Sequence, residues 1–332
     1  MKNHFKEIER TLQGAGRILL ASHENPDGDG LGSMLAFSYY LDVQQIPHTC
    51  FSTHPIPRMY HFLPGITRFT VGEDTIALSD HDVVVFFDIG DVKRSRFADR
   101  LRQQKEKTKV INIDHHPTKM DVDGVNVVDI AVIDTAASAT TQMVHQYFEL
   151  VGHTLNQAAA TCLMTGLATD TGNFSNLGTT EESMWLGSKL LLSGARFNRI
   201  TLQTLKSKPL ADLKLWGRAL ERLKEDPKTK MVTTALFLKD LEECGVNEDA
   251  AEGISNFLNE LEGGKIICVF REKEGGEVKA SMRTTAPDGD VRSIAERFGG
   301  GGHMKAAGYT VKGTLVKGEN AWEIQQDKKP LI

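Results

Sequence analysis

The sequence predicts an α/β protein whose N-terminal domain contains a mostly parallel sheet flanked by helices, followed by a smaller α+β domain. Residues 83–87 form a continuous run of β-branched and aromatic residues, and residues 110–113 form a second, mainly apolar run that contains one polar residue, Asn112. Such runs are typical of strands that are buried on both faces, as in a parallel sheet. The C-terminal half shows strand-like segments at about 231–238, 265–271 and 277–284, and a helical segment at about 249–261.

The length of 332 residues is sufficient for about two domains. We expect a first domain at residues 1–190, a helical linker at 191–213 and a second domain at 214–332, with the active site in the cleft between the domains. Apolar residues make up 40% and charged residues 25% of the chain, which is ordinary for a globular enzyme with a sizeable core.

Charge and cysteine content restrict the class of protein. A net charge of -5 argues against binding of long nucleic acid through an extensive basic surface, because that mode requires many phosphates to be neutralised. A short anionic substrate that is held by a few contacts remains compatible with this charge. The four cysteines form no Cys-x-x-Cys pair, which indicates a reduced compartment. No stretch approaches the roughly 18 apolar residues of a membrane-spanning helix, so we expect a cytoplasmic protein without a membrane partner.

The first strand is followed by a segment that is rich in potential metal ligands. An amphipathic helix at about 2–12 and a buried strand at 17–23 come first. His23, Asp27 and Asp29 then lie within seven positions of a glycine-rich segment that leads into a helix. The glycines would let the backbone turn tightly enough for the three side chains to point inward. A plain Asp/Gly turn is the alternative, because such clusters often mark turns.

Two further strands end in polar side chains. The first of the two apolar runs is followed directly by Asp88, and the second by Asp114, His115 and His116. The carboxyl ends of parallel strands are the positions where open α/β sheets bind their ligands. Taken alone, Asp88 is compatible with a helix cap, and the two histidines with hydrogen bonds to nearby backbone.

The rest of the N-terminal half is mainly helical, and one helix ends in a carboxylate. We expect an edge strand at 126–128 and a helix at about 138–151. Asn156 is expected to cap a helix that ends near Asp170. A carboxylate is electrostatically disfavoured at a helix C-terminus, which suggests a compensating cation. Thr179 and Glu182 form a capping-box pattern that begins the next helix.

Four places in the N-terminal half thus offer oxygen and nitrogen ligands, and three of them lie at predicted strand ends. Carboxylates and imidazoles without cysteine favour Mn²⁺ or Mg²⁺ over Zn²⁺ or Fe²⁺. The number of ligands is sufficient for two ions that share a bridging aspartate, the arrangement that activates water for phosphoryl hydrolysis.

The pattern His23-x-x-x-Asp27-x-Asp29, followed by Asp88, Asp114-His115-His116 and Asp170, resembles the motifs of the DHH phosphoesterase family. The resemblance implies two Mn²⁺ ions, with Mg²⁺ as the alternative. It implies that His116 is catalytic and faces the scissile phosphate, and that Asp114 supports the histidines. It assigns one ion to His23, Asp27 and Asp88, and the other to Asp29, Asp88, His115 and Asp170.

The C-terminal half contains a second group of motifs. Arg283 ends a predicted strand, and a run of four glycines before His303 is followed by Ala306-Ala307-Gly308. Glycines permit close approach of a ligand to the backbone, whereas a flexible hinge is the alternative. The motif is similar to that of the C-terminal domain associated with DHH nanoRNases. That similarity implies that substrate is bound by Arg283, Gly300, Gly301, Gly302 and His303.

The resemblance to the nanoRNase branch implies hydrolysis of short RNA or DNA oligonucleotides to mononucleotides, and removal of phosphate from adenosine 3',5'-bisphosphate. Alternatives are a cyclic or linear dinucleotide phosphodiesterase, an inorganic pyrophosphatase, which Arg283 and the glycine run disfavour, and a nucleotide sensor without activity. A homodimer is compatible with the sequence. No function is assigned to residues 315–332, and the last dozen residues are expected to be disordered.

Overall fold

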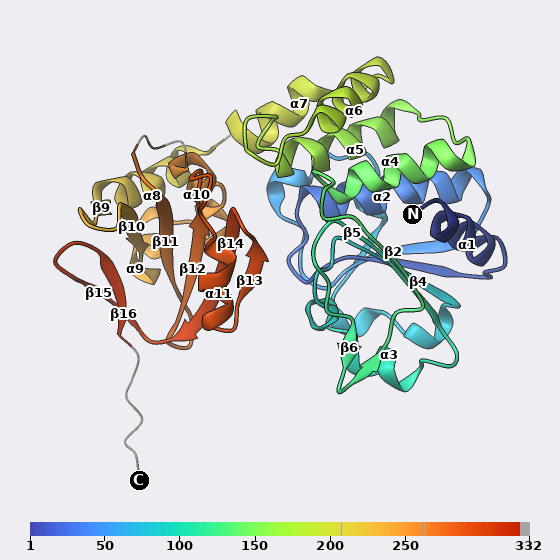
Figure 1. Cartoon of the computed structure of the whole chain (residues 1–332), viewed down its shortest axis with the longest axis horizontal. Helices are drawn as coiled ribbons and strands as arrows, with labels where there is room; N and C mark the ends of the chain where they lie inside the picture. The colour runs from blue at the N-terminus through green and yellow to red at the C-terminus, as the bar shows by residue number, and fades with distance from the viewer. Residues whose placement is uncertain (207, 260, 262, 326–332) are drawn as a thin grey trace, which may run out of the picture. The chain divides into compact units, whose positions relative to one another are not determined.

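The computed structural model describes residues 1–206, 208–259, 261 and 263–325, and the chain divides into two compact units, Met1–Lys206 and Ser207–Ile332 (Figure 1). Each unit is built around its own six-stranded sheet. Within the described residues, no helix is both long and apolar enough to cross a membrane.

The sheet of the first unit is parallel throughout, as predicted. Its strands, in spatial order, are β3 (Phe69–Val71), β2 (His48–Ser52), β1 (Ile18–Ala21), β4 (Val83–Phe87), β5 (Lys109–Asp114) and β8 (Ile130–Ile133). Along β4, Val83, Val85 and Phe87 face one hydrophobic core and Val84 and Phe86 the other, because successive side chains of a strand point to opposite faces. Burial on both faces explains the uninterrupted apolar run at 83–87.

The direction in which strands are added reverses between β1 and β4. The chain first adds β2 and β3 on one side of β1, and then β4, β5 and β8 on the other. In folds of this kind, ligands bind beyond the carboxyl ends of the strands at the reversal point. The predicted edge strand at 126–128 is wrong, because β7 (Val125–Asn126) pairs with β6 (Asp121–Val122) outside the sheet. The edge strand is β8, whose Ile130 and Val132 are buried, whereas both residues of β7 are exposed.

Helices cover both faces of this sheet. Figure 1 shows α2, α4 and α5 packed together over one face, whereas α3 lies on the other side. The helices of the first unit are α1 (Lys2–Gln13), α2 (Gly28–Val43), α3 (Ala98–Gln103), α4 (Thr140–Val151), α5 (Gln157–Asp170), α6 (Glu181–Leu192) and α7 (Phe197–Thr201), followed by a π-helical turn at Leu202–Lys206.

The glycines of the ligand-rich segment lie in a helix. Asp27 is the N-cap residue of α2, which begins at Gly28. A Cβ on Gly28 would collide with the side chain of Thr169, and one on Gly32 with the carbonyl oxygen of Cys162, both on α5. The interpretation of these glycines as turn-forming is therefore wrong. They are needed because α5 packs closely on α2.

The sheet of the second unit is mostly antiparallel, which confirms the α+β prediction. Its strands, in spatial order, are β13 (Gly301–His303), β14 (Ala306–Lys312), β12 (Glu277–Arg283), β11 (Ile266–Lys273), β10 (Met231–Leu236) and β9 (Lys224–Glu225), with only β10 and β11 parallel among the described residues. Its helices are α8 (Leu210–Glu221), α9 (Leu238–Cys244), α10 (Ile254–Leu258) and α11 (Val291–Arg297).

Three predictions about helices and termini need correction. The helix expected at about 249–261 is divided into a 3-10 turn and α10, because Gly253 between them adopts a left-handed conformation, with φ +85°. The capping box of α6 uses Thr180 and Ser183 instead of Thr179 and Glu182.

The prediction of disorder at the C-terminus is wrong for β16 (Trp322–Gln325), which pairs with β15 (Thr314–Lys317). Trp322 is buried, and its indole N–H donates to the carbonyl oxygen of Arg222 at 2.8 Å. These contacts attach the segment to the core of the second unit. Residues 326–332, to which the same prediction applied, lie outside the described residues.

Candidate metal centre

The three predicted strand-end ligand groups meet at one edge of the parallel sheet. His23 follows β1, Asp88 follows β4 directly, and Asp114 ends β5, with His115 next in the chain. Because β1, β4 and β5 are adjacent and parallel, their carboxyl ends lie side by side. The fold thus brings together side chains that lie more than 90 positions apart in sequence.

Asp88 lies at the centre of the group. Its Oδ2 is 3.5 Å from Nε2 of His23, and its Oδ1 is 3.7 Å from Nε2 of His115 and 3.1 Å from Nδ1 of His116. The side chain is only 2% exposed, and its residue has φ +55°, a conformation that is uncommon outside glycine. Such backbone strain clusters at functional sites, and this placement of two oxygens suits a bridging ligand.

One side of Asp88 faces His23 and Asp27. Nε2 of His23 is 3.8 Å from Oδ2 of Asp27, and one ligand atom from each of the three residues lies within 4.8 Å of the others. The other carboxylate oxygen of Asp27 accepts hydrogen bonds from the backbone N–H groups of Asp29 and Gly30, at 3.0 and 3.1 Å. The start of α2 therefore fixes Asp27 with one oxygen directed toward His23.

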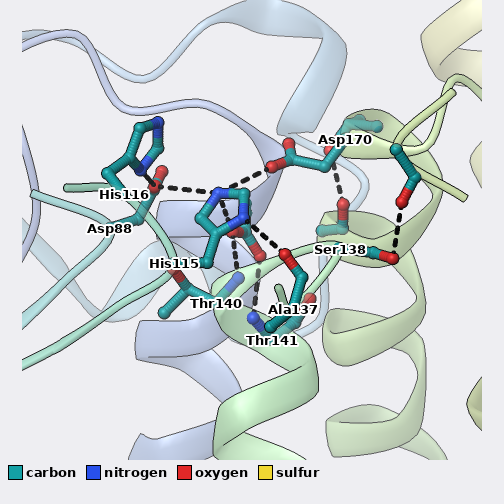
Figure 2. Close-up of polar contacts among 12 residues, drawn as sticks. Asp88, His115, His116, Ala137, Ser138, Thr140, Thr141 and Asp170 are labelled. Carbon is teal, nitrogen blue, oxygen red and sulfur yellow. Dashed lines mark hydrogen bonds and ion pairs between the residues drawn. The ribbon is translucent and has the colours of Figure 1, made fainter. Parts of the chain in front are cut away.

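The opposite side of Asp88 faces His115, Asp29 and Asp170. Nε2 of His115 lies 3.7 Å from Oδ2 of Asp29 and 3.2 Å from Oδ2 of Asp170. Figure 2 shows the ring of His115 directed toward Asp170. Nδ1 of His115 lies 3.2 Å from the carbonyl oxygen of Ala137. This backbone acceptor requires the proton on Nδ1, which directs Nε2 to the carboxylates as in a metal-ligating histidine.

Asp29 is held by the N-terminus of α4. Its two carboxylate oxygens accept hydrogen bonds from the backbone N–H groups of Thr140, at 2.6 Å, and Thr141, at 2.9 Å. The positive end of the helix dipole favours a carboxylate there. Gly166 of α5 lies against the same carboxylate, because a Cβ at this position would stand 2.6 Å from Oδ1 of Asp29. These contacts are not predictable from the sequence, because they join segments more than 100 positions apart.

His116 is oriented by Asp114. Oδ1 of Asp114 accepts a hydrogen bond from the backbone N–H of His116 at 2.8 Å, and it lies 2.9 Å from Nδ1 of the same histidine. Asp114 is fully buried, whereas the His116 side chain is 21% exposed. The aspartate thus fixes the ring from behind, and the ring keeps a solvent-accessible side.

The electrostatics of the cluster favour a bound cation. Burial, and then the neighbouring Asp170 and Asp88, raise the pKa of Asp29 well above its usual value. Burial alone would lower the pKa of His23 and His115, but nearby carboxylates outweigh it and raise the two values to about 9 and about 10. Protons on these groups offset the repulsion among buried carboxylates. The donor set of buried carboxylates and imidazoles therefore fits divalent metal ions, which would replace those protons.

The predicted substrate-binding residues lie in the second unit, on three neighbouring strands. Arg283 of β12 pairs with Ala306 of β14, which pairs with His303 of β13. Directly opposed residues point to the same face of a sheet, so Arg283 and His303 share one face, about 10 Å apart. Nε of Arg283 donates to the side-chain oxygen of Asn256 in α10 at 2.8 Å, a contact that the sequence did not predict.

The second half of the glycine run, Gly301 and Gly302, lies in β13, and Gly300 directly precedes this strand. A Cβ on Gly300 would collide with the carbonyl oxygen of Gly308. A Cβ on Gly302, which has φ +138°, would lie 2.5 Å from the carbonyl oxygen of Ala306. Strand pairing thus requires glycine at these two positions. A Cβ on Gly301 would meet no atom within 4 Å, so this residue leaves open space above its backbone.

Comparison with known families is consistent with this geometry. Residues 17–167 match the DHH family N-terminal domain, and residues 228–326 match the DHHA1 domain. A Thermus thermophilus relative named bifunctional oligoribonuclease and PAP phosphatase NrnA is 30% identical over 92% of this chain and 87% of its own length. The chain belongs to the DHH family. A Bacillus subtilis protein of the same name is 24% identical over 92% of this chain and 90% of its own length.

The fold of this DHH protein is also found in a solved structure, an exopolyphosphatase-related protein from Bacteroides fragilis. The two chains superpose with a TM-score of 0.83 at 24% identity, covering 95% of this chain and 92% of the other. The DHH match contains the carboxyl ends of β1, β4 and β5, and the DHHA1 match contains Arg283 and His303. Of the residues in the two candidate groups, Asp170 lies three positions beyond the end of the DHH match at residue 167.

Proposed function

We propose that this DHH protein hydrolyses short RNA or DNA oligonucleotides to mononucleotides and dephosphorylates adenosine 3',5'-bisphosphate. One observation carries the proposal: histidines and aspartates from β1, β4, β5 and α5 converge around the buried carboxylate of Asp88. Similarity to relatives with these named activities, over 92% of the chain, supports the substrate class.

The first domain would supply the hydrolytic machinery. We propose two divalent ions, Mn²⁺ or alternatively Mg²⁺; once bound, they would act as Lewis acids and lower the pKa of a water. Asp88 would contact both ions, because its two oxygens face opposite groups. The proposed ligands of one ion are His23, Asp27 and Asp88, and those of the other are Asp29, Asp88, His115 and Asp170.

His116 would stabilise the negative charge that develops on the scissile phosphate. Its Nδ1 is held between the carboxylates of Asp114 and Asp88, at 2.9 and 3.1 Å, and these carboxylates raise the pKa of the imidazole well above its ordinary value despite burial. A protonated, preoriented imidazole is a strong donor to a phosphate oxygen, and it requires no reorganisation during the reaction. Asp114 would be a positioning residue that acts through this ring.

The second domain would bind the nucleotide. Arg283 offers a planar guanidinium for bidentate binding of a phosphate, and its contact with Asn256 restricts its orientation. His303, on the same face of the sheet, offers a donor or a stacking surface to the terminal nucleotide. Among the glycines, Gly301 leaves its backbone open to a ligand, whereas Gly300 and Gly302 maintain the strand pairing beneath it.

We assign these roles to domains at 1–190 and 214–332, joined by a linker at 191–213.

The four cysteines are free, three of them are buried, and burial raises the pKa of Cys50 to about 11. Unreactive thiols of this kind support action in the reducing cytoplasm.

The experiment is a substrate series. Metal-stripped protein is resupplied with Mn²⁺ or Mg²⁺ and incubated with a dinucleotide, a 20-mer, adenosine 3',5'-bisphosphate, a cyclic dinucleotide and pyrophosphate, with products separated chromatographically. We expect the dinucleotide and adenosine 3',5'-bisphosphate to be consumed fastest. Exclusive cleavage of pyrophosphate or of the cyclic dinucleotide would contradict the proposal, as would nucleotide binding without turnover.

A further inference from the structure

A hollow of the first unit lies at the opposite end of α5 from Asp170. It has a volume of about 300 Å³, and its lining includes Arg196, Arg199, Phe62 and the first residues of α5. This volume reaches the lower limit of small-molecule sites in proteins. The helix runs from Gln157 to Asp170, so its ends lie about 20 Å apart, at 1.5 Å per residue. The hollow shares no residue with the metal cluster.

The charge in this hollow is uncompensated. α5 has no acidic residue in its first turn, and no carboxylate is among the residues that line the hollow. Arg196 and Arg199 therefore lie beside the positive end of a 14-residue helix. Cations are disfavoured at a helix N-terminus, whereas anions are favoured there. An anion in the hollow would remove this repulsion.

The two arginines are also oriented. Nη2 of Arg196 donates to the side-chain oxygen of Gln157 at 3.1 Å, and its backbone N–H donates to the hydroxyl of Thr161 at 3.3 Å. Arg199 follows three positions later, one helical turn along, which places it on the same side of the chain. Its guanidinium lies 5.9 Å from the centre of the Phe62 ring. The hollow therefore combines two planar phosphate donors with an aromatic ring.

We propose that this hollow is a second binding site for a nucleoside monophosphate. The phosphate would lie between Arg196, Arg199 and the start of α5, because guanidinium groups bind phosphate oxygens in pairs. The base would lie against Phe62, since aromatic side chains stack on every base. The inference does not rest on the proposed hydrolytic reaction, because its argument uses only the charge, shape and lining of the hollow.

The test is calorimetric titration of the full chain, loaded with Mg²⁺, with adenosine 5'-monophosphate. Arg196→Gln/Arg199→Gln removes the two guanidinium donors. Ala158→Glu places a carboxylate in the lining, where it would repel a phosphate, while its interaction with the positive end of the helix dipole stabilises α5. Arg10→Gln, on the exposed side of α1, is the matched control. We expect the hollow to bind one molecule of adenosine 5'-monophosphate in the wild-type protein and in the control, in addition to any molecule that binds at the metal centre. In each of the two variants, the affinity of one site for adenosine 5'-monophosphate should fall roughly tenfold or more, because phosphate binding is weakened.

Three outcomes would overturn the proposal. The first is no binding of adenosine 5'-monophosphate to the wild-type protein, and the second is binding, at one site or at two, that neither variant weakens. The third is equal binding of inorganic phosphate and adenosine 5'-monophosphate at the affected site, which would leave no role for Phe62. Hydrolysis at low substrate concentration is expected to be unchanged in both variants. A loss of the site with intact hydrolysis would separate this inference from the proposed function.

Discussion

Replacing Asp114 by asparagine tests how His116 is held. The carboxylate accepts from the backbone N–H of His116 at 2.8 Å and lies 2.9 Å from its Nδ1, and the aspartate is fully buried. Asp114→Asn keeps the shape of the side chain but removes its charge. A hydrogen bond to a charged group contributes about 1.5–3 kcal/mol, and each 1.36 kcal/mol changes a rate tenfold. We therefore expect kcat to fall about 10- to 100-fold.

The pH dependence separates this effect from simple destabilisation. Asp114 and Asp88 together raise the pKa of His116, so loss of the Asp114 charge lowers that pKa. If the protonated imidazole stabilises the scissile phosphate, the alkaline limb of the kcat profile moves to lower pH. Bound metal should be unchanged, because Asp114 is not a proposed ligand. Asp121→Asn, in the exposed part of β6, is the control.

The assay is hydrolysis of a dinucleotide between pH 6 and pH 10, with metal content measured on the same samples. Loss of metal from Asp114→Asn would contradict the assignment of Asp114 and His116 to roles other than metal binding. An unchanged kcat and pH profile would show that the aspartate does not act through His116.

Three further predictions follow from the geometry. Gly166→Ala should lower both metal affinity and turnover at least tenfold, because the new Cβ would lie 2.6 Å from Oδ1 of Asp29. The control is Gly217→Ala, whose Cβ meets no atom within 4 Å; equal metal affinities of the two variants would contradict close packing of Gly166 against Asp29. Metal binding should release protons at pH 7 and tighten as pH rises, because the pKa of His23 is about 9 and that of His115 about 10 without metal. Calorimetry in two buffers with different ionisation enthalpies measures the proton release, and a metal affinity that does not change with pH would contradict this prediction. Arg283→Lys should raise KM for a dinucleotide about tenfold with little change in metal content, since an ammonium group cannot bind phosphate bidentately. An unchanged KM would show that Arg283 does not bind the substrate.

The strands that carry the candidate site could be predicted because their sequences are locally unambiguous. Residues 83–87 are all apolar, and residues 110–113 are apolar except for the buried Asn112, a composition that a strand buried on both faces of a parallel sheet requires. The polar residues that follow them could then be expected at one edge of the sheet. Convergence of the side chains follows from topology and not from their spacing in the chain.

The supporting contacts could not be predicted, because they join segments that are distant in sequence. The N–H groups of Thr140 and Thr141 meet Asp29 across more than 100 positions, and nothing near Asp29 indicates this. In the sequence alone, Gly28 and Gly32 indicate a turn, because the close contact with α5 that requires glycine at both positions forms only on folding. β13 was missed for a related reason, since glycines have low strand propensity and only pairing with β14 explains them.

The most direct test of the account is the metal content of Asp88→Asn beside the wild-type protein and Asp121→Asn. Each protein is stripped, reloaded with Mn²⁺, freed of excess metal and analysed by inductively coupled plasma mass spectrometry, with dinucleotide hydrolysis measured in parallel. Because Asp88 lies between the two ligand groups, we expect two ions per chain in the wild-type protein and the control, and at most one in Asp88→Asn, with hydrolysis abolished. Two ions and normal hydrolysis in Asp88→Asn would contradict the account.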